Sequence, residues 1–205
     1  MTDRIHTPYI FSRAELQCIK DNFTSHIDWE KVIFNDIKKN IVDHLRPQQG
    51  NTCCYCKYQL GHDIKQVDIE HILPKSKYEK FTFNGKNLAL SCPACNTIKS
   101  TKEVLKKSLV RYPRSSNHIK IIHAHYDNYS EHIDIINNCV FFSKTSKGSE
   151  TITFCNLFRL SEVEDRAKAY EKITLTSLCD RLSNTSHIDP QTKQDIMNII
   201  LNKIR

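Results

Sequence analysis

Apolar residues recur at helical spacing through the first fifty residues of the chain. Ser12, followed three residues later by Glu15, is a capping-box pattern that predicts a helix over residues 13–22. A second apolar series with a period near 3.6 residues predicts another helix over residues 29–45. Residues 1–50 are therefore expected to form a helical lead-in.

Short apolar runs replace this helical pattern in the segment 51–110. The runs at 67–69 and 87–91 have the length and composition of strands. Pro93 suits the first turn of a helix, and the pattern extends that helix to about Lys107.

Strand-like and helix-like patterns are mixed in the segment 111–205. Residues 133–142 and 150–157 are rich in β-forming residues, and the polar sequence SKTSKGS between them predicts a hairpin loop. Two helices should follow, one towards Leu182 and one opened by Pro190. The chain is thus expected to have an α+β fold, with this last region packed on the middle one as a single compact unit.

The composition is that of a folded, soluble protein. Of 205 residues, 39% are hydrophobic and 26% are charged, and no run reaches the roughly 20 apolar residues of a membrane-spanning helix. The first residues lack a basic segment followed by an apolar run, so no secretory signal is expected. The sequence therefore predicts a cytoplasmic protein with no membrane partner. In that compartment the nine cysteines favour metal binding or catalysis over disulfides.

Positive charge is concentrated in one part of the chain. Residues 72–120 contain eleven lysines and arginines but only two acidic residues, whereas the rest of the chain sums to −2. A concentrated basic segment is typical of proteins that bind a polyanion such as nucleic acid. A solvated, lysine-rich surface is the alternative interpretation.

Two CxxC pairs predict a structural zinc site. Cys53 with Cys56, and Cys92 with Cys95, would each bring two thiolates to one point. Four sulfur ligands favour zinc and leave no open coordination position. Cys54 could replace Cys53 as a ligand, but Cys53 is preferred because CxxC is the better chelate.

The residues between and just after these pairs supply side chains of catalytic type. They are a carboxylate, an imidazole and two amides: Glu70, His71, Asn87 and Asn96. Carboxylate and amide oxygens suit a hard divalent cation such as magnesium. A histidine beside such an ion can deprotonate water near neutral pH.

At this point the sequence resembles the HNH nuclease family. The elements of the family pattern occur here in order as CCYC, EHILP, NL and CPACNTIK, over residues 53 to about 100. The resemblance implies a ββα-metal fold, in which two strands and a helix surround one catalytic metal. The expected fold class is then α+β with a zinc-stapled HNH core.

The resemblance also implies a role for each matching residue. Glu70 falls at the position of the acidic metal ligand, and His71 falls at that of the general base. Asn87 falls at the position that helps to fix the loop and the histidine. Asn96 falls at the position of the second metal ligand, and the four cysteines of the CxxC pairs fall at structural zinc positions.

Two departures from the family pattern bear on the catalytic metal. Glu70 stands where Asp is commoner, and Asn96 stands where His is commoner. A site of oxygen donors favours magnesium or manganese over nickel or zinc.

Adjacent residues of a strand point to opposite faces, which complicates this assignment. Glu70 and His71 can share a site only if the strand ends or bends there. Pro74 and the loop that follows it favour such a bend. Asp68 lies on the same face as Glu70 and is the alternative metal ligand.

The activity implied by the resemblance is metal-assisted hydrolysis of DNA. His71 would take a proton from water, and the metal would neutralise charge developing on the phosphate. The family implies a 5′-phosphate and a 3′-hydroxyl as product ends. The candidate contacts to the phosphate backbone, with solvated lysines as the alternative, are Lys75, Lys77 and Lys99.

The segment HAHYDNYSEH, residues 123–132, contains three histidines and two acidic residues. It could form a second metal site. The sequence favours a structural role instead, with tyrosines that pack and polar groups that bond locally.

The order of elements around the core carries a looser resemblance. A helical lead-in, the HNH elements, a hairpin and closing helices resemble the HNH subunits of bacterial antiphage systems such as Septu, encoded beside an ATPase. This resemblance implies a bacterial defence nuclease with an ATPase partner that controls cleavage. The exposed faces of the end helices are then candidate docking surfaces.

Two other functions remain open from the sequence. A zinc-stabilised nucleic-acid-binding or adaptor module would keep the fold without catalysis. An RNA-directed or toxin nuclease would use the same residues on another substrate.

Overall fold

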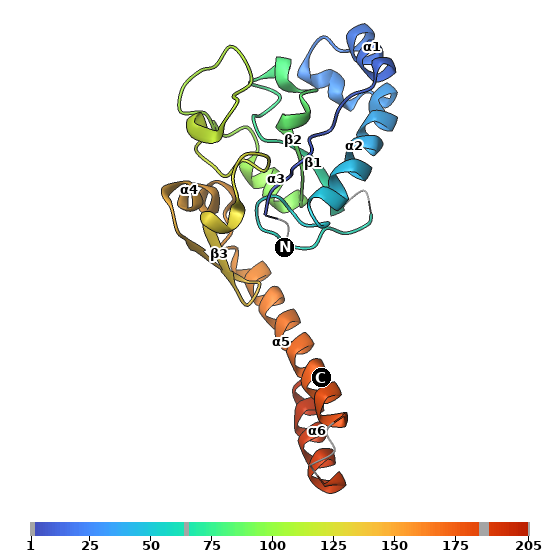
Figure 1. The fold of residues 1–205 in the computed structure, drawn as a ribbon, viewed down its shortest axis with the longest axis vertical. Helices are drawn as coiled ribbons and strands as arrows, with labels where there is room; N and C mark the ends of the chain where they lie inside the picture. The colour runs from blue at the N-terminus through green and yellow to red at the C-terminus, as the bar shows by residue number, and fades with distance from the viewer. Residues whose placement is uncertain (1–2, 64–65, 185–188, 205) are drawn as a thin grey trace. The chain divides into compact units, whose positions relative to one another are not determined.

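A computed structural model describes residues 3–63, 66–184 and 189–204. The chain is rich in helix and contains two small two-stranded sheets, which confirms the α+β fold class (Figure 1). No helix among the described residues is both long and apolar enough to cross a membrane.

Contacts divide the chain into two compact units. Unit 1 comprises Met1–Asp134 and Phe141–Leu157, and unit 2 comprises Ile135–Val140 and Phe158–Arg205. This division differs from the three regions expected from the sequence, because its boundary after Leu157 falls inside the expected third region.

The helical lead-in begins as its sequence predicts. In α1 (Arg13–Asn22) the Ser12 hydroxyl accepts from the Glu15 amide, and the Glu15 carboxylate accepts from the Ser12 amide. The second helix was predicted too early, because residues 26–34 form two short 3-10 turns before α2 (Asn35–Gln48). The buried face of α2 carries three apolar residues: Ile37, Ile41 and Leu45.

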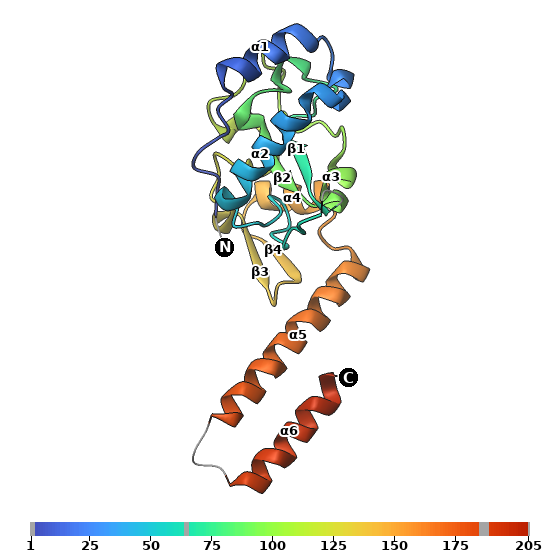
Figure 2. The ribbon, with the colours of Figure 1, turned by 90° about the vertical axis from the view of Figure 1, so that its right-hand side faces the viewer.

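A two-stranded sheet lies at the centre of unit 1. β1 (Asp68–His71) and β2 (Leu88–Ser91) pair antiparallel. α2 and α3 (Pro93–Lys99) contact this sheet and lie on different sides of it (Figures 1 and 2). The prediction that this last helix reaches Lys107 is wrong, because the chain leaves the helix at Ser100 with a φ of 47°.

The second sheet is a hairpin that lies earlier in the chain than the sequence analysis placed it. β3 (Ile133–Ile136) pairs with β4 (Val140–Ser143). The turn uses Asn137 and Asn138, which both have positive φ, a conformation that asparagine tolerates well. The expected first strand therefore contains all of this hairpin except Ser143.

The expected second strand is a helix, so that prediction is wrong. α4 (Ser146–Cys155) begins after Thr145, whose hydroxyl accepts from the Gly148 amide at 3.1 Å. A Cβ atom at Gly148 would lie 2.0 Å from the carbonyl oxygen of His132. This glycine therefore permits a close approach within a helix instead of forming a loop. α4 packs against α3.

Unit 2 contains two long helices. α5 (Leu160–Ser183) and α6 (Pro190–Ile204) contact each other and run side by side in opposite directions (Figure 2). Their exposed apolar side chains include Tyr170, Ile173, Leu178 and Ile199.

Candidate active site

Four cysteine sulfurs gather at one point of unit 1. All their Sγ atoms lie within 4.8 Å of one another, and they belong to Cys53, Cys56, Cys92 and Cys95. Cys54 is outside this set, and its amide donates to the Leu90 carbonyl. The cluster thus contains Cys53, the ligand preferred from the sequence, and not Cys54.

The chemistry of this cluster fits a bound cation. Burial raises the pKa of the Cys53 thiol well above its usual value, and the sulfurs of Cys54 and Cys56 raise it further. Within the described ranges, this is the one group of three or more His, Cys, Asp or Glu side chains that could share an ion. Four sulfurs in this arrangement fit a structural zinc, which would tie the start of the core to α3.

A cavity of about 330 Å³ lies beside the end of β1 and the C-terminal half of α3. Its lining brings together four residues of the motif: Glu70, His71, Asn96 and Lys99. Two adjacent residues of β1 therefore reach one cavity, at the point where the strand ends.

Glu70 is held by a buried ion pair. Its Oε1 pairs with the Lys99 ammonium and accepts from the Tyr55 hydroxyl at 3.0 Å, while the carboxylate is only 2% exposed. Burial raises the pKa of Glu70, although Lys99 and Tyr55 oppose this shift. Among the described residues, Oε2 has no hydrogen-bond partner, which leaves it available to a cation.

The hydrogen bond of His71 fixes its tautomer. Nε2 lies 3.2 Å from the Thr82 carbonyl oxygen, which can only accept, so Nε2 carries the proton and Nδ1 carries the lone pair. The Trp29 ring meets the imidazole edge-on, with centroids 4.6 Å apart. Burial, followed by the charges of Lys75 and Lys99, lowers the pKa of His71 to about 3. The ring is therefore neutral at neutral pH.

Asp68 orients the amide of Asn96. The Asn96 Nδ2 donates to Asp68 Oδ2 at 2.8 Å. Because a carboxylate can only accept, this bond turns the amide nitrogen towards Asp68 and leaves Oδ1 free to bind a cation. Asp68, the alternative ligand, thus contacts Asn96 without lining the cavity.

The family comparison agrees with this geometry. A family model described as HNH endonuclease matches residues 53–102. The matched segment is about a quarter of the chain, and it is similar to HNH endonucleases. The match spans both CxxC pairs and the cavity residues on β1 and α3, so the resemblance inferred from the sequence is confirmed.

Two curated relatives share part of the chain. Septu protein PtuB of Bacillus thuringiensis is 31% identical over 119 residues, which is 58% of this chain and 41% of that protein. The Retron Vc95 putative HNH endonuclease of Vibrio cholerae is 34% identical over 62 residues, 29% of each chain. This chain thus spans about two fifths of the first relative and less than a third of the second.

Asn87, within the segment that the family model matches, fastens the loop that follows His71. Its Oδ1 accepts from the Leu73 amide at 2.8 Å, and its Nδ2 donates to the carbonyls of Leu73 and Phe81. The side chain is fully buried and does not line the cavity. Its contacts are those of a residue that fixes a loop.

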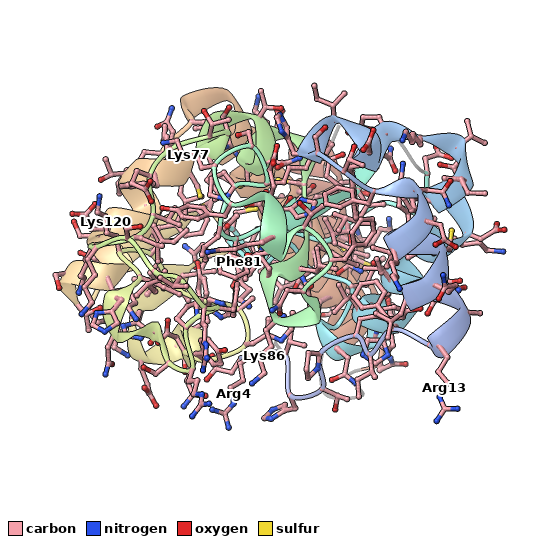
Figure 3. All side chains as sticks on the ribbon, turned by 90° about the horizontal axis from the view of Figure 1, so that it is seen from above. Arg4, Arg13, Lys77, Phe81, Lys86 and Lys120 are labelled. Carbon is pink, nitrogen blue, oxygen red and sulfur yellow. The ribbon has the colours of Figure 1, made fainter. Side chains whose placement is uncertain are left out.

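The three lysines expected to contact phosphates differ in their surroundings. The side chains of Lys75 and Lys77 are 30% and 41% exposed, and Lys75 lines the cavity. Lys99 also lines the cavity, but it is only 1% exposed and is engaged by Glu70 and the His71 carbonyl, so its ammonium is already paired within the protein. Figure 3 shows Lys77 and Lys120 towards the periphery of the view.

The segment at residues 123–132 uses its polar groups internally. The His123 Nδ1 accepts from the His125 amide, and its Nε2 lies 2.8 Å from the Tyr112 hydroxyl. Asp127 is engaged by Lys147 at 3.0 Å. These bonds match the structural role that the sequence favoured.

Sequence reasoning missed four residues of the site. His26 lines the cavity, and the other three contact Glu70 or His71: Trp29, Tyr55 and Thr82. Tyr55 lies inside the first CxxC pair, so its place beside the zinc cluster was open to inspection. The other three act through the fold of distant segments, which no local pattern reveals.

Proposed function

We propose that this chain is a metal-dependent endonuclease that hydrolyses phosphodiester bonds in DNA. The observation that carries this proposal is that Glu70, His71 and Asn96 line one cavity of a zinc-clamped HNH domain. Lys75 lines the same cavity and supplies a positive charge for a phosphate.

The cavity residues fit magnesium or manganese. Oε2 of Glu70 and Oδ1 of Asn96 are hard oxygen donors without partners among the described residues. When bound there, such an ion would supply neutralisation of the charge that develops on the phosphate and the leaving oxygen.

His71 acts as the general base in this proposal. The Nε2–H of His71 donates to the Thr82 carbonyl, so Nδ1 is the atom that accepts a proton from water. The resulting hydroxide attacks the phosphorus in line, the bond to the 3′ oxygen breaks, and that oxygen takes up a proton from water. The products are a 5′-phosphate and a 3′-hydroxyl. Lys99 contributes by holding the His71 carbonyl and the Glu70 carboxylate together.

The defence role and the ATPase partner belong to the same proposal. They are supported by the similarity to Septu protein PtuB and to a retron HNH endonuclease. The exposed apolar side chains of α5 and α6 offer a surface on which a protein partner could bind. We infer that the chain is a bacterial antiphage nuclease and that its partner controls when it cleaves DNA.

Cleavage of supercoiled plasmid in magnesium tests the activity. The wild-type chain should nick or linearise the plasmid, and His71→Ala should lower the rate at least about 100-fold, as expected for a lost general base. His62→Ala, which changes an exposed histidine of the same domain, should cleave normally. A parallel reaction without magnesium tests whether cleavage depends on the metal.

Three outcomes would count against this reading. Equal cleavage by His71→Ala would remove His71 from catalysis. Preferential cleavage of RNA of the same length would replace the DNA substrate. No cleavage of either nucleic acid, alone or with an ATPase partner, would favour a zinc-stabilised binding module.

A further inference from the structure

A turn of the lead-in, outside the HNH-matched residues, forms part of the candidate active site. The turn spans His26–Glu30, and its Trp29 is 5% exposed and packs on the His71 ring. Glu30 approaches the Lys75 ammonium at 3.4 Å. The turn is therefore fastened to two residues that line the cavity.

The first residue of this turn lines the cavity itself. His26 shares the lining with Glu70, His71 and Asn96. Its Nδ1 lies 2.7 Å from Glu79 Oε1, and the same oxygen accepts from the His26 amide at 3.3 Å. Glu79 thus holds both the ring and the backbone of His26.

The second ring nitrogen of His26 is left for a ligand. Among the described residues, Nε2 of His26 has no hydrogen-bond partner, and the side chain is 32% exposed. A doubly protonated imidazole donates from both nitrogens, so a ring tied to a carboxylate through Nδ1 can donate from Nε2 to an anion. Lys75 is a second cation in the same lining.

We propose that His26 is a substrate-contacting residue that donates from Nε2 to a phosphate oxygen of nucleic acid bound in the cavity. The proposal rests on the proposed nuclease function for the identity of the substrate. It extends the site from the HNH domain into the lead-in, so that the domain alone does not complete the substrate-binding surface.

Binding of a fluorescently labelled 20-base-pair DNA duplex, measured by anisotropy without added magnesium, tests this role. His26→Ala should weaken the affinity about ten-fold, the loss expected for one charge-assisted hydrogen bond. His26→Gln should retain most of the affinity, because its amide can still donate. His118→Ala should bind like the wild type, since His118 is similarly half-buried and does not line the cavity.

Zinc content and thermal unfolding of each variant separate a substrate contact from a structural tie between the turn and Glu79. Wild-type zinc and stability together with weak binding by His26→Ala support the proposal. Unchanged binding by His26→Ala overturns it. Equal loss of binding in the Ala and Gln variants with lowered stability also overturns it, in favour of a structural tie.

Plasmid cleavage by the wild type, run in parallel with magnesium, keeps the two proposals apart. Cleavage by the wild type and by His26→Ala at equal rates, with equal binding, rejects the role of His26 alone. Weaker binding by His26→Ala in a chain that never cleaves supports the contact and rejects the nuclease. A wild type that does not bind the duplex rejects both.

Discussion

Lys99 is the residue whose environment departs most from its expected role. Lys99 was expected to contact the phosphate backbone, and its side chain is buried against Glu70. The helical period indicated that Lys99 is buried, because Lys99 lies four residues after the buried Cys95 and both lie on one face of α3. What the sequence could not give was Glu70 as its partner, 29 positions earlier on β1.

Removing the charge of Lys99 should strongly destabilise the protein. Lys99→Met would leave the Glu70 carboxylate buried without its counter-charge, which typically costs about 3–5 kcal/mol. Chemical denaturation of the zinc-loaded protein would measure the loss. The double variant Lys99→Met/Glu70→Gln should recover part of it, because no uncompensated charge then remains.

Lys77→Met is the matched control for this substitution. Its ammonium is 41% exposed and lies 3.9 Å from Glu103, so its removal should change the free energy of unfolding by less than about 0.5 kcal/mol. A Lys99→Met protein as stable as the control would mean that Glu70 does not depend on Lys99.

His125 should make the protein less stable in acid. Its Nε2 donates to the Leu88 carbonyl at 2.8 Å, and burial lowers its pKa to about 4. A histidine in the unfolded chain has a pKa near 6.5. Below that pH the unfolded chain therefore binds a proton at position 125, whereas native His125 stays neutral until about pH 4. The stability should fall by about 2 kcal/mol between pH 7 and pH 5 from this residue, and not change above pH 7.

Denaturation curves at several pH values would isolate this contribution. His125→Gln can still donate to Leu88 but does not titrate, so its stability should depend less steeply on pH than that of the wild type. His62→Gln, at an exposed position, should follow the wild-type slope. Parallel slopes for the wild type and His125→Gln would assign the acid sensitivity to other groups.

At the scale of elements, the sequence predicted the parts that carry local signals. The capping box at Ser12 gave the start of α1, and the paired CxxC turns gave the zinc cluster. α4 was mistaken for a strand because its Thr, Ile and Phe residues favour β structure locally. In the fold, the Thr151 hydroxyl accepts from the Ile122 amide inside the core, a long-range contact that overrides local preference.

The zinc cluster should be required for the β1–β2–α3 core to fold. Cys53→Ser would remove one of the four sulfurs, and metal binding supplies folding energy directly in a core this small. The variant should lose zinc and should show no cooperative thermal unfolding. Zinc content by metal analysis and unfolding by circular dichroism would test this expectation.

Cys54→Ser is the closest control that the chain offers. Cys54 neighbours Cys53 and is also buried, but its sulfur lies outside the cluster. This variant should keep one zinc per chain, although the buried serine hydroxyl should lower its stability slightly. Loss of zinc from Cys54→Ser and retention in Cys53→Ser would reverse the assignment of the ligand.

At the scale of the whole molecule, the candidate site and the end helices belong to different units. Every residue that lines the cavity lies in unit 1. Unit 2 is dominated by two helices whose apolar side chains stay exposed, including Ile173 at 68% and Ile199 at 63%. Patterns along the sequence predicted these helices, but their grouping into a unit of their own depends on long-range contacts that the sequence does not display.

A chain truncated after Leu157 should therefore retain the zinc, the cavity and DNA binding. The truncation removes α5 and α6 and leaves the zinc cluster, the β1–β2 sheet and the His26 turn in place. Cleavage by the truncated chain should equal that of the full chain when no partner is present, whereas any binding to an ATPase partner should be lost. The full chain with Ile173→Glu is the matched control. This substitution should lower the affinity for the partner and leave zinc content and DNA binding unchanged. If truncation released the zinc or abolished DNA binding, α5 and α6 would be needed to build the site, and their exposed apolar face would need an explanation within this chain.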